Sequence, residues 1–380
     1  MDVPELRFPE FSGEWEEKKL VDIAKFSKGK GISKKDISEE GIPCIRYGEL
    51  YTTYKEKISD VVSKTNLSKD ELVFSSENDI IIPTSGETAI DIATASCVIN
   101  EGIGIGGDTT IIKTKGDGLF FSYYLNSKRK NIAKLAQGVS VVHLYSTHLK
   151  ILDLKVPQIE EQEKIASFLS KVDEKIGFLE KKQELWKTYK KGIMQQIFSQ
   201  ELRFKDENGA DYPDWEEKVL GDLIAGSSSN LSINNLENNA GVYPLYGAVG
   251  FMKNIDFYEK DEKYIAIIKD GAGVGRTLLC DKKSSILGTM QYLTSKDQNE
   301  LIFTYYLMSY MNFKKYIIGS TIPHIYYKDY SKEKINVPTF SEQRKIANLL
   351  GDIDLKIDQI KKENKITKEF KKGLLQKLFC

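Results

Sequence analysis

Two glycine-rich stretches contain the residue types of nucleotide-binding loops. Residues 102–107 fit G-x-G-x-x-G, but a strand-like run at 108–112 follows where a dinucleotide site needs a helix. Residues 271–277 resemble a phosphate-binding loop, but three residues separate the outer glycines instead of four, and Arg276 replaces the required lysine. We therefore predict a β-turn for the first stretch. The second is either a structural turn or a loop that presents Arg276 to DNA.

The histidines and cysteines are spaced for neither metal binding nor a disulfide framework. His143 and His324 occupy equivalent positions of an internal repeat, so they cannot join one compact metal site. The chain has four cysteines, Cys44, Cys97, Cys280 and Cys380. They form no C-x-x-C pair, and we expect reduced thiols. A glycine-rich methyl-donor loop, an Asn-Pro-Pro-aromatic motif and paired carboxylates for nuclease chemistry are also missing from the sequence. We predict no catalytic residue, no metal and no cofactor.

The charge balance confines any DNA binding to local patches. The chain carries 55 basic and 55 acidic side chains, so it has no global basic field and is not expected to bind DNA tightly by itself. One lysine run comprises Lys25, Lys28, Lys30, Lys34 and Lys35. These lysines are either simply solvated or position phosphates. Arg46 and Tyr47, in a loop that matches Leu245 and Tyr246, are candidates for contacts with bases. Residues 227–230 are either a phosphate-contacting loop or a linker.

The chain contains one long segment twice. Residues 156–199 and 337–380 align without a gap at an offset of 181, and 18 of the 44 pairs are identical. Chance does not produce this agreement over so long a run. The same offset extends back to Gly138 and Gly319, through His143 and His324. An internal duplication therefore sets the organisation of the chain.

A second repeat opens each copy. Glu-Leu-Arg-Phe at 5–8 recurs at 201–204, and Trp-Glu-Glu-Lys at 15–18 recurs at 215–218. In the first copy the long segment runs from Phe198 into the next Glu-Leu-Arg-Phe, whereas the chain stops at Cys380. The N-terminal copy supplies that continuation. The layout is circular, and we expect each end of the chain to complete the other.

Each long repeated segment has the apolar pattern of a coiled coil. In the first copy the d positions are Ile165, Val172, Leu179, Trp186 and Ile193. The a positions of that copy are Leu169, Ile176, Gln183, Lys190 and Ile197. In the second copy the d positions are Ile346, Ile353, Ile360, Thr367 and Leu374. The a positions of that copy are Leu350, Ile357, Asn364, Lys371 and Leu378. Gln183 and Asn364 share one a position, where a polar residue fixes register and partner number. The alternative is two unrelated amphipathic helices, each packed on its own core. Such helices would not share a polar residue at the same a position.

We predict two helices of about 57 Å each, at 1.5 Å per residue. They are expected to pack antiparallel, which would place the variable blocks at opposite ends, related by a pseudo-two-fold axis. The expected pairing residues are Leu169, Ile176, Gln183, Leu350, Ile357 and Asn364.

Two variable blocks, about residues 25–137 and 225–318, differ in length and resemble each other weakly. Short β-like runs, such as 79–83, 109–113 and 263–268, alternate with glycine and polar turns. A helix-like run follows in each block, at 120–134 and 301–316. The predicted fold class is α+β, with two β-rich α/β domains separated by two long helices that form an antiparallel coiled coil.

These elements together resemble the DNA-specificity subunit of type I restriction–modification systems. The resemblance rests on the opening Pro4–Pro9 segment with Trp15, the closing Pro157 with Glu161-Gln162 and Ile165-Ala166, and the block-two segments 243–247 and 270–276. It covers nearly the whole chain. Block one departs from the pattern, because residues 83–88 stand where block two has the glycine-rich loop.

The resemblance implies a non-catalytic subunit that recognises a bipartite, asymmetric duplex DNA target with two target-recognition domains. It implies that the helices set the gap between the half-sites and dock two methyltransferase subunits, and that restriction/translocase subunits join the complex. Candidate DNA contacts are Lys28, Lys30, Lys34, Arg46, Tyr47, Ser85, Thr88, His143, Tyr246, Lys269, Arg276, His324 and Tyr326. The expected domains are 1–155 and 200–336 for target recognition, and 156–199 and 337–380 for the spacer helices.

Two other functional classes were weighed. A coiled-coil scaffold without DNA recognition predicts interchangeable globular blocks, whereas these blocks diverge while the helices stay alike. The sequence lacks the motifs that an autonomous methyltransferase or nuclease would need. Residues 1–10 do not have the basic and apolar regions of a signal peptide, and no apolar run reaches about 18 residues. We therefore expect a soluble, cytoplasmic protein.

Overall fold

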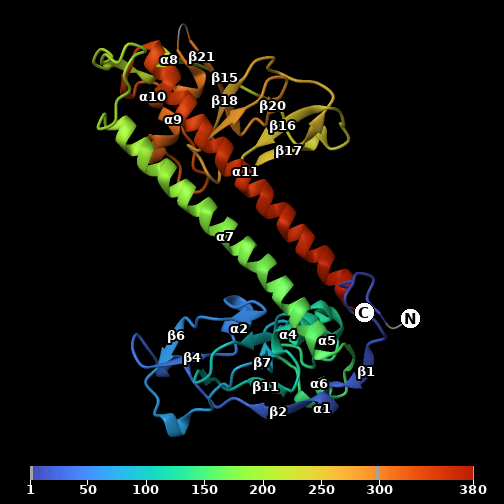
Figure 1. Ribbon diagram of the computed structural model, residues 1–380. Coiled ribbons are helices and arrows are strands. Elements are labelled where there is room, and N and C mark those ends of the chain that lie inside the picture. The colour runs from blue at the N-terminus through green and yellow to red at the C-terminus, as the bar shows by residue number, and fades with distance from the viewer. Residues whose placement is uncertain (1–2, 297–298, 380) are drawn as a thin grey trace. The chain divides into compact units, whose positions relative to one another are not determined.

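The computed structural model describes residues 3–296 and 299–379. It divides into two compact units, Met1–Glu180 with Lys362–Cys380, and Lys181–Lys361. Each unit contains part of both long helices, α7 (Ile159–Phe198) and α11 (Phe340–Leu378) (Figure 1). The first unit therefore joins the N-terminal segment to the end of α11, as the circular layout predicted.

The core of the first unit is a five-stranded sheet that is covered on both faces. Its strand order is β2 (Ala24–Lys28), β11 (Thr109–Thr114), β7 (Asp79–Pro83), β9 (Ser96–Val98) and β5 (Lys57–Ile58). Strand β7 is buried along its whole length. Ile80 and Ile82 pack with the aromatic residues of α4 (Gly118–Ser127), whereas Ile81 joins a second core on the opposite face. The period of two along a strand explains this division.

The second core lies against a four-stranded sheet in the order β10 (Gly104–Ile105), β4 (Ile42–Ile45), β6 (Ser63–Thr65) and β3 (Ile37–Ser38). Two short sheets pair β1 (Glu16–Lys19) with β13 (Asp153–Val156), and β8 (Ser85–Gly86) with β12 (Val142–His143). The remaining helices are α1 (Leu20–Ile23), α2 (Glu49–Thr52), α3 (Ala89–Ile92), α5 (Arg129–Ala133) and α6 (Ser146–Lys150).

The second unit repeats this plan with fewer strands. Its main sheet has the order β15 (Ile224–Ser228), β21 (Met290–Ser295), β18 (Tyr264–Ile268) and β19 (Thr277–Cys280). A three-stranded sheet has the order β17 (Gly250–Ile255), β16 (Tyr243–Gly247) and β20 (Ser285–Ile286), and β14 (Glu216–Val219) pairs with β22 (Lys334–Val337). The short helices are α8 (Leu220–Leu223), α9 (Leu301–Tyr310) and α10 (Tyr327–Tyr330).

The two helix-like runs of the variable blocks are interrupted, which corrects the prediction. Residues 120–134 fall into α4 and α5, and residues 301–316 fall into α9 and a 3₁₀ turn, Phe313–Tyr316. The side chain of Asn312 accepts a hydrogen bond from the Lys314 amide at 3.1 Å. Such a local bond begins a new turn and so competes with continuation of the helix.

The long helices pack together within each unit, and they run antiparallel. In the first unit Lys175 pairs with Glu363 at 3.0 Å, and Asp173 pairs with Lys371 at 2.7 Å. The residue numbers of the paired positions therefore decrease along α7 as they increase along α11. In the second unit Lys190 of α7 pairs with Asp354 of α11 at 2.7 Å. The predicted pair of long antiparallel helices is confirmed.

The heptad side chains form the helix seam and also join the domain cores. Leu169 and Ile176 share a core with Leu374 and Leu378 in the first unit. In the second unit Leu350 and Ile357 pack with Met194 and Ile197. Asn364 is buried and Gln183 is half-buried, each in its own unit. The seam and the domain cores are thus continuous within a unit.

The repeated opening motif forms a buried clamp in the first unit. Arg7 donates two hydrogen bonds to Glu161, Nε to Oε1 at 2.8 Å and Nη2 to Oε2 at 2.7 Å, and Trp15 Nε1 donates to Oε1 at 3.3 Å. Glu161 lies in the first turn of α7, where its negative charge also favours the helix N-terminus. The clamp fastens the opening motif to the start of the long helix.

The second unit contains the same clamp. Arg203 donates to Glu342 through Nε and Nη2, both at 2.9 Å, and Trp215 Nε1 donates at 3.2 Å. The adjacent glutamine of the Glu-Gln pair has a repeated role too, because Gln343 donates to the Pro338 carbonyl at 3.0 Å and Gln162 to that of Pro157 at 2.8 Å. The repeated residues therefore build one frame twice.

The circular layout is visible in one further contact. The Leu202 amide donates to the Gln196 carbonyl, near the end of α7, at 3.0 Å. The Leu6 amide donates to the Lys377 carbonyl, near the end of α11, at 2.9 Å. Gln196 and Lys377 are equivalent at the offset of 181. The N-terminal segment thus meets α11 as the middle segment meets α7.

Removing the carboxylate of the clamp is expected to destabilise its unit strongly. Glu342→Ala leaves Arg203 and Trp215 without their partner, and breaking a buried ion pair costs about 3–5 kcal/mol of unfolding free energy. Glu217→Ala, which breaks the exposed pair with Lys334, is the matched control and should cost at most about 1 kcal/mol. Urea unfolding of both variants measures the difference. Equal stabilities would show that the clamp does not hold the second unit.

Candidate nucleic-acid interface

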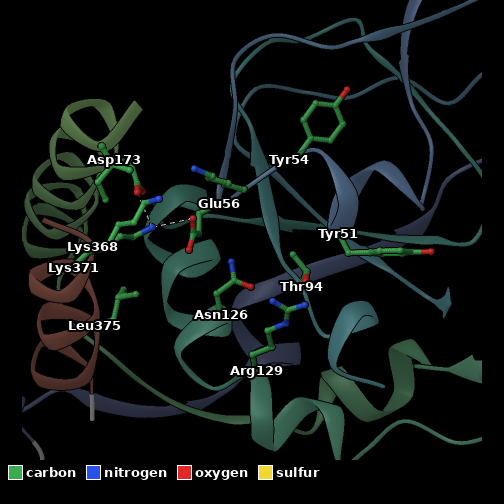
Figure 2. Close-up of a pocket in the computed structure, with 12 residues that line it drawn as sticks. Tyr51, Tyr54, Glu56, Thr94, Asn126, Arg129, Asp173, Lys368, Lys371 and Leu375 are labelled. Carbon is green, nitrogen blue, oxygen red and sulfur yellow. Dashed lines mark hydrogen bonds and ion pairs between the residues drawn. The ribbon is translucent and has the colours of Figure 1, made fainter. Parts of the chain in front are cut away.

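A charged network connects the helix seam to the β-rich domain of the first unit. Lys371 Nζ lies 2.7 Å from Asp173 Oδ1 and 3.2 Å from Glu56 Oε2, at the wall of a cavity of about 350 Å³ (Figure 2). Tyr123 of α4 donates its hydroxyl to Asp173 Oδ2 at 2.6 Å. Burial and the nearby Asp173 carboxylate raise the pKa of Tyr123, so the hydroxyl stays a donor. The network ties α7, α11 and α4 together.

The second unit has the equivalent network. Lys190 Nζ lies 2.7 Å from both Asp354 oxygens, and Tyr306 of α9 donates to Oδ2 at 2.8 Å. Burial raises the pKa of Tyr306 as well. In both units the lysine occupies an a position of one helix and its aspartate lies on the other. The polar seam residues therefore also fix each domain to the helix pair.

The structure brings Ser85 and His143 together at the end of the central strand of the first unit. They are paired residues of β8 and β12. In the second unit Asp270 and His324 form the corresponding backbone bridge, beyond the end of β18. Ser85 is 8% exposed. Its side chain is therefore poorly accessible to a ligand, and its backbone pairs with that of His143. Both histidines are half-buried.

An aromatic ring lies beside each histidine. Tyr145 stacks on His143 with the ring centroids 6.1 Å apart, and Tyr326 meets His324 edge-on at 5.0 Å. Both tyrosines are exposed. Tyr326 was a sequence candidate but Tyr145 was not. The offset of 181 that relates the two histidines also relates these tyrosines, and it could have identified Tyr145.

The remaining candidates of the first unit lie on separate elements and loops. Arg46 donates to Glu49 Oε1 at 3.1 Å, and Tyr47 beside it is exposed. Thr88 caps α3, because its hydroxyl oxygen accepts from the Asp91 amide at 3.2 Å. Lys30 donates to the Asp70 carbonyl at 3.1 Å. Lys28 and Lys34 are exposed, as are Lys25 and Lys35.

The candidates of the second unit gather around the glycine-rich loop. Gly271, Gly273 and Gly275 all have φ near +85°, which allows the tight turn that carries Arg276. Arg276 is exposed and donates to the Ala248 carbonyl. Lys269 lies at the start of this loop, and its backbone carbonyl accepts from the Ile325 amide at 3.0 Å. Tyr246 is half-buried and contacts Phe251 edge-on at 6.5 Å.

Several other sequence interpretations have structural outcomes. The β-turn predicted for residues 102–107 is wrong, because this stretch forms the short strand β10, which pairs with β4 and is flanked by bends. Strand β11 follows it, as predicted. Ser229 is buried, and its hydroxyl accepts from the Leu231 amide at 3.2 Å. Cys44, Cys97 and Cys280 are buried free thiols, and burial raises the pKa of Cys97 and Cys280 to about 12. Cys380 lies outside the described residues.

Two features are absent from the described part of the chain. Within residues 3–296 and 299–379, no three His, Cys, Asp or Glu side chains are grouped to hold a metal ion. Over the same residues, no helix has the length and apolar character needed to cross a membrane.

The fold and the repeated contacts define a duplicated protein in which two β-rich domains are built on one pair of long helices. The family of type I restriction modification DNA specificity domains matches residues 12–185 and 212–368. The type I restriction enzyme MjaVIII specificity subunit of Methanocaldococcus jannaschii is 26% identical over 98% of this chain and 93% of its own. The putative MjaX specificity subunit of the same organism is 30% identical, over 70% and 68%.

Solved structures share the fold. The S subunit of a type I restriction-modification system from M. genitalium has a TM-score of 0.72 at 20% identity, and the match covers 100% of this chain and 99% of that one. A chain from a structure that describes complex assembly of the type I R-M system has a TM-score of 0.55 at 17% identity, with 96% of each chain covered. The protein belongs to the specificity subunits of type I restriction–modification systems, which are not catalytic.

Proposed function

We propose that this subunit recognises a bipartite, asymmetric duplex DNA sequence, with one half-site read by each β-rich domain. The proposal includes two methyltransferase subunits docked on the helix frame, and restriction/translocase subunits in the full complex. One observation carries it: the Arg-Glu-Trp clamp and the Lys-Asp-Tyr network recur in both units, while the exposed loops differ. A constant frame with variable loops is consistent with two domains that recognise different DNA sequences and share one frame for binding partner subunits.

The proposed domains follow the sequence repeats. We assign target recognition to residues 1–155 and 200–336, and spacing to 156–199 and 337–380. In support, β13 ends at Val156 and β22 ends at Val337, and a long helix begins shortly after each. The helix pairing is assigned to Leu169, Ile176, Gln183, Leu350, Ile357 and Asn364.

The proposed DNA contacts fall into two classes. Three exposed lysines, Lys28, Lys30 and Lys34, would position phosphates together with the half-buried Lys269. Phosphate contacts fix the register of a protein on the duplex without reading bases. Arg46, Tyr47, Tyr246 and Arg276 would contact bases, because arginine pairs with the acceptor edge of guanine. His324 forms a backbone bridge with Asp270 at the glycine-rich loop, and Tyr326 lies beside it. His143 would contact DNA from its pairing with Ser85, and Ser85 and Thr88 would contribute mainly through the backbone that they order.

The purified chain is expected to show neither methylation nor cleavage, and to confer both when its partner subunits are added. The physical reason is that recognition and catalysis reside on different chains. Radiolabelled methyl transfer to duplex DNA measures the first activity, and plasmid cleavage measures the second. Methyl transfer by the chain alone, after removal of contaminating methyltransferase, would contradict the proposal.

A coiled-coil scaffold without DNA recognition is the second candidate. It is favoured only by the neutral charge balance of 55 basic and 55 acidic side chains. Competition binding separates the two. The proposed complex should prefer its target over unrelated duplex by a factor of about 10³ or more, whereas a scaffold would give no sequence preference.

A further inference from the structure

Strands β16 and β17 of the second unit form a hairpin whose turn contacts Arg276. The other edge of β16 pairs with β20 at Leu245 and Tyr246, so residues 247–250 extend beyond that pairing. Strands β16 and β17 pair antiparallel, with Tyr246 opposite Phe251 and Gly247 opposite Gly250. Ala248 and Val249 therefore form a two-residue turn. Gly250 has φ of +102°, a left-handed conformation that closes such a turn and that other residues rarely adopt.

The tip of this hairpin is apolar and exposed. Val249 is 82% exposed and Phe251 is 58% exposed, and Met252 follows at 40%. Three apolar side chains that are close in the sequence are therefore exposed to solvent at this turn. Exposed apolar patches on a protein surface often mark interaction sites. Tyr246 extends the surface, since its ring meets Phe251 edge-on.

Charge distinguishes the two ends of the hairpin. At the tip the Arg276 guanidinium donates to the Ala248 carbonyl, and within the described residues Arg276 has no carboxylate partner. The opposite end leads into the acidic residues Asp256, Glu259, Asp261 and Glu262. Lys260 and Lys263 alternate with these carboxylates, so the feature that distinguishes the tip is the positive charge of Arg276, which attracts a polyanion.

The first unit has a different element at the equivalent place. Arg46 and Tyr47, which match Leu245 and Tyr246, lead into the short helix α2 instead of a turn and a second strand. The frame is shared, but the element that follows this loop is not. The hairpin is thus a feature of the second domain only.

We propose that the tip of the β16–β17 hairpin enters the major groove of the half-site read by the second domain, where Val249 and Phe251 make apolar contacts with the bases. This inference rests on the proposed function. The part of the hairpin beyond the pairing with β20 has two chain segments joined by a turn, and a two-stranded β-element fits the major groove. Apolar side chains there recognise the thymine methyl group. Arg276 holds the turn and adds positive charge beside the phosphates.

The test compares two exposed valines of one hairpin. Val249→Ser alters the tip, and Val242→Ser alters the opposite end, where Val242 is 76% exposed and lies about 20 Å away at 3.3 Å per residue. Phe251→Ser is the second tip variant. Each variant is assembled with its methyltransferase subunits, and binding is measured on duplexes that carry every single-base change in both half-sites.

We expect both tip variants to lose preference at one or two positions of a single half-site, by about 5- to 100-fold. The remaining positions of that half-site should keep their preference, which shows that the second domain is folded, and the other half-site should be unchanged. Val242→Ser should match the unaltered chain. An unchanged profile for both tip variants would overturn the hairpin assignment. So would loss of the methyltransferase subunits on purification, which would identify the tip as a protein-docking surface. If the unaltered complex itself preferred no bipartite sequence, the proposed function would fail instead.

Discussion

Exchanging residues 25–137 for the corresponding block of a relative is expected to replace one half of the recognised DNA sequence and to leave the other half unchanged. The parts of the frame outside this block keep their contacts, because Arg7, Trp15 and Glu161 all lie beyond its ends. Tyr123 and Glu56 lie within the block. The donor must therefore carry a tyrosine and a glutamate at those positions to preserve the network with Asp173 and Lys371.

The magnitude of this change should be large. Affinity for the original target should fall toward that for unrelated duplex, a loss of about 10³-fold or more. The reciprocal exchange of residues 225–318 is the matched control and should alter the opposite half-site. Sequencing the methylated motifs of cells that carry each chimera gives both half-sites directly. If one exchange changed both halves together, the assignment of one domain to one half-site would be wrong.

Lengthening the two helices is expected to widen the gap between half-sites without changing either sequence. Four residues inserted before Gln183 add about 6 Å of helix, or roughly two base pairs of B-DNA. A matching insertion before Asn364 keeps both buried networks, since Lys190 pairs with Asp354 in one unit and Lys371 with Asp173 in the other. The heptad register shifts by four, which locally unwinds the coil and should lower affinity.

The controls for the insertion separate spacing from general damage. The same four residues placed between Asp261 and Glu262, in an exposed turn, should leave the gap as it was. Insertion in α7 alone should weaken binding more than the double insertion, because the helices then lose their register. Motif sequencing of the methylated DNA reads the gap. An active double-insertion complex with the original gap would show that the helices do not set it.

Much of the helical frame was predictable, because its signals are local and repeated. A pattern over five heptads needs no knowledge of distant residues. The offset of 181 gives the same pattern a second time in the chain, which supports the interpretation of each copy. The circular layout followed from the same comparison, and Leu6 and Leu202 meet α11 and α7 accordingly.

The contacts that the repeats make were not predictable from their spacing. Arg7 and Glu161 are separated by 154 positions, so no local pattern links them, although both belong to repeated motifs. Lys190 and Lys371 occupy a positions of the two helices. Their aspartate and tyrosine partners, such as Asp173 and Tyr123, come from other elements and become neighbours only on folding.

The exposed loops were the least predictable part. Thr88 was a candidate DNA contact, yet its hydroxyl oxygen caps α3. Val249 and Phe251 attracted no attention in the sequence, because apolar residues in a strand-like run usually point to a core. Exposure is a property of the packed molecule, and only the structure distinguishes this hairpin from a buried one.

The most direct measurement is the pattern of methylated bases in a host genome with and without this gene. In the host that carries the gene, we predict one motif of two short specific halves separated by a fixed gap, methylated at nearly every occurrence. Deleting the gene while keeping the methyltransferase gene should abolish methylation at that motif and leave other motifs untouched. If the same bipartite motif remained methylated after the deletion, this chain would not be the subunit that reads the DNA.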